Sequence, residues 1–358
     1  MSIYRLGMGS TLLVLALLVA GCSSEEAELE SPVRLQGNIF GSFYQVSISD
    51  RLTASRAEAL EAGFLEVLNE IDATMSTYRE DAELVDFNHS PIGEWQTLSD
   101  ELIEVLAISE TILQLSGGAF DPTIGGLANL WSFGPEARPR EIPDEQELQS
   151  RLDEIGFAQL EVDTNSLQAR RLSEVFVDLS GVAKGYATDR VATYLDGEGV
   201  EHYLVNLGGD LIAKGYRDRD STPWRIGVEV PEDGSQQIAQ HTLPVHDMSV
   251  ATSGDYRNYF EEDGRRFSHT IDPRSGYPVD HTLASVSVLH PSNAWADAWA
   301  TALLVLGPDE GLALAREQEL MVLTLERDSE GWTSRTSPAF VDYFGREQLE
   351  ALGIEIDD

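Results

Sequence analysis

The chain has 358 residues, enough for one large domain or two average ones with a substantial buried core. It carries 62 acidic residues against 24 basic ones, a net charge of −38, with Lys184 and Lys214 as its two lysines. Nucleic acid and anionic lipid surfaces are poor partners for such a chain. An acidic surface poor in lysine is typical of proteins adapted to high salt, where screening reduces self-repulsion.

The first residues predict a secretory signal rather than a part of the fold. Arg5 precedes an apolar run that ends at Val19 and is too short for a comfortable membrane span. Small residues then lead to Cys22, the pattern of a lipobox, so residues 1–21 are expected to be a cleaved lipoprotein signal peptide. Cys22 is the only cysteine, which leaves the chain without an internal disulfide.

The thiol of Cys22 is therefore best explained as a lipid attachment site, and a free cysteine in the core is the other interpretation. Residues 22–32, with serines and acids after the cysteine, predict a lipid-anchored tether. Residues 33–358 are then expected to form the folded body, with a surface excursion or a seam between two lobes at the proline-rich residues 134–143.

Hydrophobic periodicity predicts the elements of this body. In chain order they are strands over 33–49 with irregular points at Gly37 and Gly41, a helix at 54–73, a loop at 75–78, a helix from 99 to Gly117-Gly118, a short helix at 144–155, strands near 160–162 and 175–179, a helix at 184–195, strands at 203–205, 225–230 and 249–252, a hairpin joining 256–260 to 267–271, a strand at 284–289, a helix at 292–308, and strands near 322–325 and 332. Hairpins dominate this order, which favours an α+β fold with mixed, largely antiparallel sheets and packed helices.

One acidic residue lies inside the apolar helical run SNAWADAWATALLVLGP, residues 292–308. Asp297 is surrounded by Ala, Trp, Leu and Val, and Thr301 follows one turn later on the same helix face. An unpaired buried carboxylate costs several kcal/mol or shifts its pKa, and a hard divalent cation would bind both the carboxylate and the hydroxyl oxygen. The other interpretation places Asp297 at the solvent edge and bonds Thr301 to its own helix.

Four turns carry further polar groups. In residues 177–186 a strand end, a glycine and a helix start follow one another, so Gly181 could offer a carbonyl to a metal and the helix could favour phosphate. Phe120, in 117–123, could lie against a flat ring, and His269, in 268–276, is a possible proton acceptor. The fourth, residues 206–210, indicates a β-turn. Each turn also has an ordinary structural interpretation, but together they predict a pocket for a phosphate-containing ligand with a hard metal.

Seven segments, in order and over essentially the whole mature chain, resemble the ApbE family of FAD:protein FMN transferases. They are residues 76–78, 118–123, 178–187, 206–210, 252–254, 269–273 and 297–301. Each segment alone is a weak signal, whereas seven in register are a strong one. The lipobox agrees, since many family members are lipoproteins, so the resemblance implies a lipid anchor in the bacterial cytoplasmic membrane with the protein facing the periplasm or exterior.

The resemblance implies that FAD lies between the turns with Mg²⁺ on its pyrophosphate. Asp297, Thr301 and the carbonyl of Gly181 would hold the metal. The residues that would line the flavin nucleotide are Phe40, Tyr78, Ala119, Phe120, Asp121, Asp178, Lys184 and Ile271. A Thr or Ser hydroxyl of an acceptor redox protein would attack the FMN-side phosphorus and release AMP, and His269 is the catalytic candidate for handling the hydroxyl proton.

Two positions depart from the family pattern, and a third, Lys184, varies among family members. Phe40 stands where Met is frequent, Ala300 stands where some members have a second acid, and some members have an acid in place of Lys184. Two alternative functions are open: an FAD pyrophosphatase that produces FMN and AMP, and a flavin-binding or acidic scaffold lipoprotein without turnover. Asp297 and Thr301 argue against the second, because retention of a flavin does not require a metal at the pyrophosphate.

Overall fold

The computed structural model of the chain describes residues 26–136, 138–229, 239–255, 258–327, 331–354 and 356. The expected signal peptide and Cys22 lie outside these ranges, so the cleavage and the lipid attachment stay predictions. Within the described ranges, no helix has both the length and the apolar character that a membrane crossing requires.

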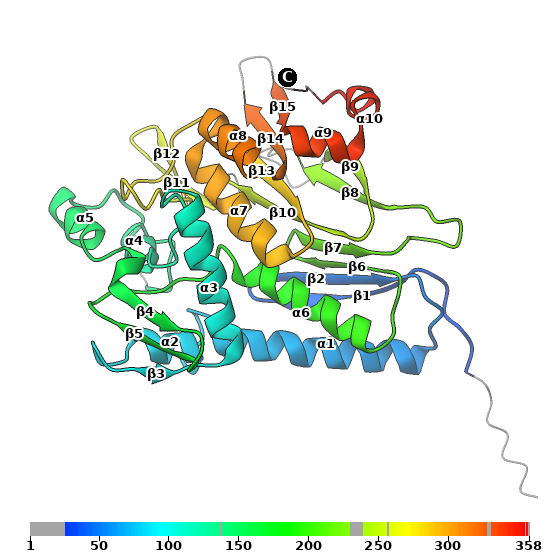
Figure 1. The fold of residues 1–358 in the computed structure, drawn as a ribbon, viewed down its shortest axis with the longest axis horizontal. Coiled ribbons are helices and arrows are strands. Elements are labelled where there is room, and N and C mark those ends of the chain that lie inside the picture. The colour runs from blue at the N-terminus through cyan, green and yellow to red at the C-terminus, as the bar shows by residue number, and fades with distance from the viewer. Residues whose placement is uncertain are drawn as a thin grey trace, which may run out of the picture.

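An eight-stranded sheet with the order β1-β2-β6-β7-β10-β13-β14-β15 forms the centre of the molecule (Figure 1). Its strands are β1 Val33–Ile39, β2 Ser42–Ile48, β6 Tyr203–Leu207, β7 Asp210–Lys214, β10 Met248–Gly254, β13 Leu283–His290, β14 Met321–Arg327 and β15 Trp332–Thr336. Every neighbouring pair in this sheet is antiparallel. The predicted α+β class with largely antiparallel sheets is therefore confirmed.

Smaller sheets and ten α-helices surround the central sheet in the described part of the chain. The small sheets are β3-β5-β4 (Gln96–Thr97, Gln168–Arg171, Leu160–Asp163), β8-β9 (Trp224–Glu229, Ala239–Val245) and β11-β12 (Tyr259–Glu262, Arg265–Ser268). The helices are α1 Ala54–Met75, α2 Glu83–Asn88, α3 Asp100–Leu115, α4 Gly125–Leu130, α5 Glu145–Leu152, α6 Ala183–Gly197, α7 Asn293–Leu306, α8 Pro308–Glu317, α9 Pro338–Phe344 and α10 Arg346–Ala351.

The two faces of the central sheet carry separate hydrophobic cores, because successive strand residues point to opposite sides. Ala251 and Val288 lie in the larger core, to which α1, α3, α6 and α7 contribute. Their neighbours Val250 and Leu289 lie in a second core, which β8, β9, α9 and α10 cover. Figure 1 shows α6 and α7 lying across one face of the sheet. Asp297 is thus carried on a helix packed directly against the sheet.

Residues 134–136 and 138–143 lie between α4 and α5, and their side chains are exposed or half-buried. The two helices contribute Leu127 and Leu148 to one shared hydrophobic cluster, in which Trp131 stacks on Phe267 with 5.5 Å between ring centroids. Since the elements on both sides of the proline-rich segment pack together, the surface excursion fits this arrangement better than a seam between lobes.

Several predicted boundaries differ from the structure. The strand expected at 175–179 is an extended segment with one isolated bridge, from Phe176 to Ile124. The amide of Asn88 explains this, because it bonds both the N–H and the C=O of Val177 at 2.8 Å and takes the place of a neighbouring strand. The hairpin predicted to join 256–260 to 267–271 has shorter strands, at 259–262 and 265–268. Residues 256 and 257 of the prediction lie outside the described ranges.

The described part of the expected tether is bonded to the folded body. The N–H of Leu29 donates to the carbonyl of Leu52 at 2.8 Å, and Glu26 accepts from the N–H of Ser55 at 3.0 Å. Residues 26–32 therefore run beside the start of α1, and a freely moving tether would have to lie before them.

His241 in β9 is a buried histidine with both ring nitrogens bonded. Nδ1 lies 3.1 Å from the carbonyl oxygen of Leu352, and Nε2 lies 2.7 Å from the hydroxyl of Ser334. Burial lowers the pKa of His241 below its usual value of about 6.5. The unfolded chain then binds a proton at this position more readily than the folded chain.

This difference predicts a loss of stability in mild acid. The contribution of a neutral His241 is complete above about pH 6.5 and falls by up to about 1.4 kcal/mol per pH unit below it. Urea denaturation at pH 7.5 and 5.5 should show a smaller loss of unfolding free energy in His241→Gln than in the unchanged protein. Equal losses in both proteins would show that His241 is not responsible.

Candidate active site

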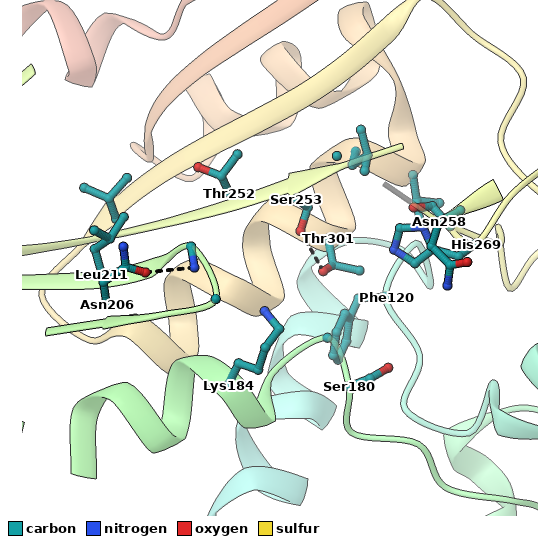
Figure 2. Close-up of a pocket in the computed structure, with 18 of the residues that line it drawn as sticks. Phe120, Ser180, Lys184, Asn206, Leu211, Thr252, Ser253, Asn258, His269 and Thr301 are labelled. Atoms are coloured by element: carbon teal, nitrogen blue, oxygen red, sulfur yellow. Dashed lines mark hydrogen bonds between the residues drawn. The ribbon is translucent and has the colours of Figure 1, made fainter. Parts of the chain in front are cut away.

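A cavity of about 890 Å³ opens where the β6–β7 turn, β8, β10, α7 and the segment before α6 meet. This volume lies within the usual range for cofactor and small-molecule sites. Its lining includes eight of the predicted site residues, namely Ala119, Phe120, Asp121, Asp178, Gly181, Lys184, Ile271 and Thr301, together with His269. Figure 2 shows Lys184, Phe120, Thr301 and His269 arranged around this space. These predicted residues therefore converge on one cavity from four separate segments of the chain.

The predicted metal residues Asp297 and Thr301 lie one turn apart on α7. The Asp297 side chain is buried, with 4% of the residue exposed, so the solvent-edge interpretation is wrong. Its Oδ2 accepts a hydrogen bond from the N–H of Gly185 at 3.0 Å. Burial first, and then the neighbouring negative charge of Asp210, raise the pKa of Asp297 well above its usual value, while Lys184 opposes the rise. A carboxylate in this position would be stabilised by a cation.

Close packing of α6 on α7 brings Gly185 to Asp297. A Cβ atom at Gly185 would lie 2.4 Å from the backbone oxygen of Asn293 and 2.8 Å from the Cβ of Asp297. Since backbone atoms cannot move aside locally, any side chain here would push the two helices apart. Glycine at this position is what allows the backbone of α6 to bond the buried carboxylate.

The Gly185→Ala substitution is therefore expected to lower the unfolding free energy by about 1–3 kcal/mol, the usual cost of overpacking. Gly197, at the other end of the same helix, has no atom within 4 Å of its Cβ position and serves as the control. Gly197→Ala should be neutral or stabilising by roughly 0.5–1 kcal/mol. Chemical denaturation of both variants measures the difference, and equal effects at the two positions would contradict the packing argument.

Gly181 completes the predicted metal set. Its Cβ position lies 3.3 Å from Oγ1 of Thr301 and 3.0 Å from the Phe120 ring, so the glycine lies against both side chains. Oγ1 of Thr301 is also 3.1 Å from the hydroxyl of Ser253 in β10 (Figure 2). Carboxylate, hydroxyl and carbonyl oxygens are the donors that Mg²⁺ prefers, so the residues fit a hard cation.

The described residues hold no cluster of three or more His, Cys, Asp or Glu side chains arranged for a metal. A cation at this site would therefore depend on the hydroxyl and carbonyl oxygens as well as on Asp297.

Lys184 lines the same cavity from the first turn of α6. Its Nζ forms an ion pair with Oδ2 of Asp210, the first residue of β7. The lysine side chain is 39% exposed, while the aspartate side chain is 2% exposed. Lys184 thus presents its positive charge at the cavity and shares it with a buried carboxylate, while its contact with a nucleotide stays a prediction.

Asp121 and Asp178 both line the cavity through turns closed by their own carboxylates. Oδ1 of Asp121 accepts from the N–H and the hydroxyl of Thr123 at 2.8 and 2.6 Å, and Oδ1 of Asp178 accepts from the N–H of Ser180 at 2.8 Å. These are Asx turns, the ordinary structural interpretation at 117–123. Burial raises the pKa of Asp121. Both carboxylates therefore shape the backbone around the cavity as well as lining it.

His269 directly follows β12, is accessible to solvent and lines the cavity. Its Nδ1 is 3.1 Å from the carbonyl oxygen of Asn258. Because a carbonyl oxygen can only accept, Nδ1 carries the proton in the neutral ring and Nε2 keeps its lone pair. Crowding by protein atoms desolvates the ring and lowers the pKa of His269, with Asn258 and the charge of Asp255 opposing this. The ring is neutral at pH 7 and can accept a proton.

Asp297 is not itself among the lining residues of this cavity, and neither are Phe40 and Tyr78. Phe40 is in the β1–β2 turn with a φ of 53° and packs on the larger core. Phe43, the second residue of β2, lines the cavity instead. Tyr78 is 70% exposed and donates to the carbonyl of Phe133 at 3.1 Å. Desolvation and then the charge of nearby Asp178 raise the pKa of Tyr78. Contact of either residue with a flavin stays a prediction.

Several lining residues had no individual role in the sequence interpretation. They are Phe43, Asn206, Arg225, Thr252, Ser253 and Asn258, joined by Asp210 through its ion pair with Lys184. Asn206, Asp210, Thr252 and Ser253 lie in segments that carry the family resemblance, so a signal existed for them. Arg225 and Asn258 had no comparable signal, because they reach the cavity only through the placement of β8 and of the segment before β11.

Known proteins resemble this chain over most of its length. The sequence model of the ApbE family matches residues 40–324. The FAD:protein FMN transferase of Vibrio cholerae serotype O1 is 38% identical over 330 residues, which cover 92% of this chain and 97% of that protein. The FAD:protein FMN transferase of Escherichia coli K12 is 34% identical over 345 residues, which cover 94% and 97% of the two chains.

Solved structures extend the likeness to the fold. The flavin transferase ApbE from Vibrio cholerae superimposes with a TM-score of 0.78 at 35% identity, covering 87% of this chain and 98% of that chain. The apo form of the Pseudomonas stutzeri flavinyl transferase ApbE superimposes with a TM-score of 0.79 at 36% identity, covering 87% and 96%. The match of sequence and fold along most of its length shows that this chain belongs to the ApbE family.

Proposed function

We propose that this protein is a Mg²⁺-dependent FAD:protein FMN transferase that moves FMN from FAD to a Thr or Ser hydroxyl of an acceptor redox protein and releases AMP. The observation that carries the proposal is the buried carboxylate of Asp297 on α7, with Thr301 and Gly181 beside a cavity of about 890 Å³. The names of the similar proteins, FAD:protein FMN transferase, support the choice of donor and product.

The chain's own residues divide the work of binding. Asp297, Thr301 and the carbonyl of Gly181 would hold Mg²⁺, which when bound neutralises pyrophosphate oxygens and the charge that develops on the departing AMP. Phe120 offers an aromatic ring to the flavin, and Lys184 adds positive charge for the phosphates. These contacts would hold the FMN-side phosphorus in line for attack.

His269 would accept the proton of the attacking hydroxyl at Nε2. As the new bond forms between the acceptor oxygen and the FMN-side phosphorus, the bond between this phosphorus and the bridging oxygen breaks, and AMP leaves with that electron pair. The hydrogen bond from Nδ1 to Asn258 orients the ring and fixes the tautomer that can do this. FMN ends as a phosphoester of the acceptor protein.

The test incubates the purified protein with FAD, Mg²⁺ and a candidate redox subunit and follows the subunit by mass spectrometry. An added FMN on a Thr or Ser, lost when Mg²⁺ is chelated, is the expected result. Equal release of FMN and AMP with or without the acceptor would favour the pyrophosphatase. Retention of FAD without any AMP would favour a flavin-binding protein and overturn the proposal.

We also propose that a lipid on Cys22 anchors the protein to the bacterial cytoplasmic membrane, facing the periplasm or exterior. The support is the apolar run followed by small residues and the single cysteine. A Cys22→Ser variant produced in a bacterial host should leave the membrane fraction, whereas the unchanged protein should remain in it. Equal membrane association of both would count against the anchor.

A further inference from the structure

Asp210 has no assigned role in the proposed reaction, although it is the buried partner of a residue at the active site. Its side chain is 2% exposed, and its carboxylate pairs with the Nζ of Lys184. A charge that is removed from water this completely is costly unless its partner and position are well defined. The surroundings of Asp210 therefore indicate a specific role for this pair.

The backbone holds Asp210 firmly. Leu207 and Asp210 face each other across a two-residue turn formed by Gly208 and Gly209, which have φ values of 64° and 111°. The side-chain oxygen of Asn206 accepts from the N–H of Gly209 at 2.9 Å and closes the turn. Only glycine adopts such conformations readily at both positions. In the ion pair, the carboxylate is thus the fixed member and the long lysine side chain is the adjustable one.

Lys184 leaves α6 directly beside the metal residue. The N–H of the next residue, Gly185, donates to Oδ2 of Asp297 at 3.0 Å. The charges of both Asp210 and Lys184 act on Asp297, in opposite directions. Two buried carboxylates, Asp210 and Asp297, therefore share the field of one ammonium group.

We propose that Asp210 is a positioning residue that holds the ammonium of Lys184 away from Asp297 and so keeps Asp297 available to Mg²⁺. The inference rests on the proposed function, because it takes the cation at Asp297 to be Mg²⁺. Without the charge of Asp210, the ammonium of Lys184 would be drawn towards Asp297, on which its charge already acts. The ammonium would then compete with the metal for the same oxygens and repel it.

The test measures Mg²⁺ binding rather than turnover. Mg²⁺ is titrated calorimetrically into the metal-free protein, and the variants are compared without nucleotide because Lys184 is itself proposed to contact phosphate. The unchanged protein is also titrated with one equivalent of ADP, which has a pyrophosphate but no FMN to transfer. Asp210→Asn is expected to weaken Mg²⁺ binding by at least about tenfold, within the usual range of coupling between sites. Adding Lys184→Met to this variant removes the competing ammonium and should restore the affinity to within about threefold of the unchanged protein.

The chain offers a matched control in its other lysine. Lys214 of β7 and Asp196 of α6 form an ion pair at 3.5 Å between the same two elements, and neither residue lines the cavity. Asp196→Asn should leave Mg²⁺ binding unchanged. Thermal unfolding of each variant shows whether it is folded at the temperature of the titration.

The outcomes separate this inference from the proposed function. No Mg²⁺ binding by the unchanged protein in either condition would overturn the metal site itself. Normal binding that Asp210→Asn does not weaken, or weakens without rescue by Lys184→Met, would overturn the positioning role alone. Should Asp210→Asn fail to fold, Lys184→Met alone decides: binding at least as tight as in the unchanged protein supports the role, and weaker binding overturns it.

Discussion

Asp297→Asn is expected to reduce Mg²⁺-dependent FMN transfer by on the order of 10³-fold, as for loss of a group that stabilises charge in the transition state. Asparagine keeps the size of the side chain and its carbonyl can still accept from Gly185, but it loses the charge that a hard cation requires. The measurement is AMP release, together with FMN on the acceptor by mass spectrometry, over a range of Mg²⁺ concentrations.

The fold should survive this change. Burial and the charge of Asp210 disfavour an ionised Asp297, so the neutral side chain should leave the unfolding free energy of the metal-free protein unchanged or higher. Thr301→Ser, which keeps the hydroxyl, is the control for a mild disturbance of α7 and should retain most activity. AMP release at the normal rate in Asp297→Asn would remove the metal assignment.

His269→Gln is expected to slow FMN transfer by roughly 10²–10⁴-fold, the usual contribution of a general base. FAD and Mg²⁺ should still bind, because the proposed role of the His269 ring is to accept a proton and not to bind the metal. Flavin fluorescence measures FAD binding, and single-turnover transfer to the acceptor measures the chemical step. A variant that loses FAD affinity and transfer in equal proportion would show that His269 serves binding instead.

The pH profile adds a second readout for His269. Desolvation lowers the pKa of this ring below about 6.5, so the base is unprotonated at pH 7 and the rate should stay level until the pH falls below that value. In His269→Gln this acid limb should disappear. His246, which stacks on Tyr216 at 5.5 Å and does not line the cavity, provides the control, and His246→Gln should keep the normal profile.

Much of the local structure followed from periodicity. The apolar steps at Leu60, Phe64, Leu68 and Ile71 predict α1, and all four side chains are buried in it. Thr53 also caps this helix, with its hydroxyl accepting from the N–H of Arg56. Such features depend on residues a few positions apart, which the helix brings together whatever the rest of the chain does.

Some predicted elements differ from the structure, and in one of them a distant residue decides the local backbone. Val177 was predicted in a strand, but Asn88 bonds its backbone from 89 positions away. The helix predicted to end at Pro308 ends at Leu306, and Pro308 is instead the first residue of α8, a position where its missing N–H costs nothing.

The amino-acid sequence by itself determined the family, the mainly antiparallel α+β class and the pairing of Asp297 with Thr301, because the helix repeat places residues four apart on one face. Only the tertiary structure decided that Gly181 lies against Thr301 and that Asp210 pairs with Lys184. These contacts join separate elements, and they depend on how closely α6 and α7 pack. The distance between α6 and α7 is set by the whole core and by the missing side chain of Gly185.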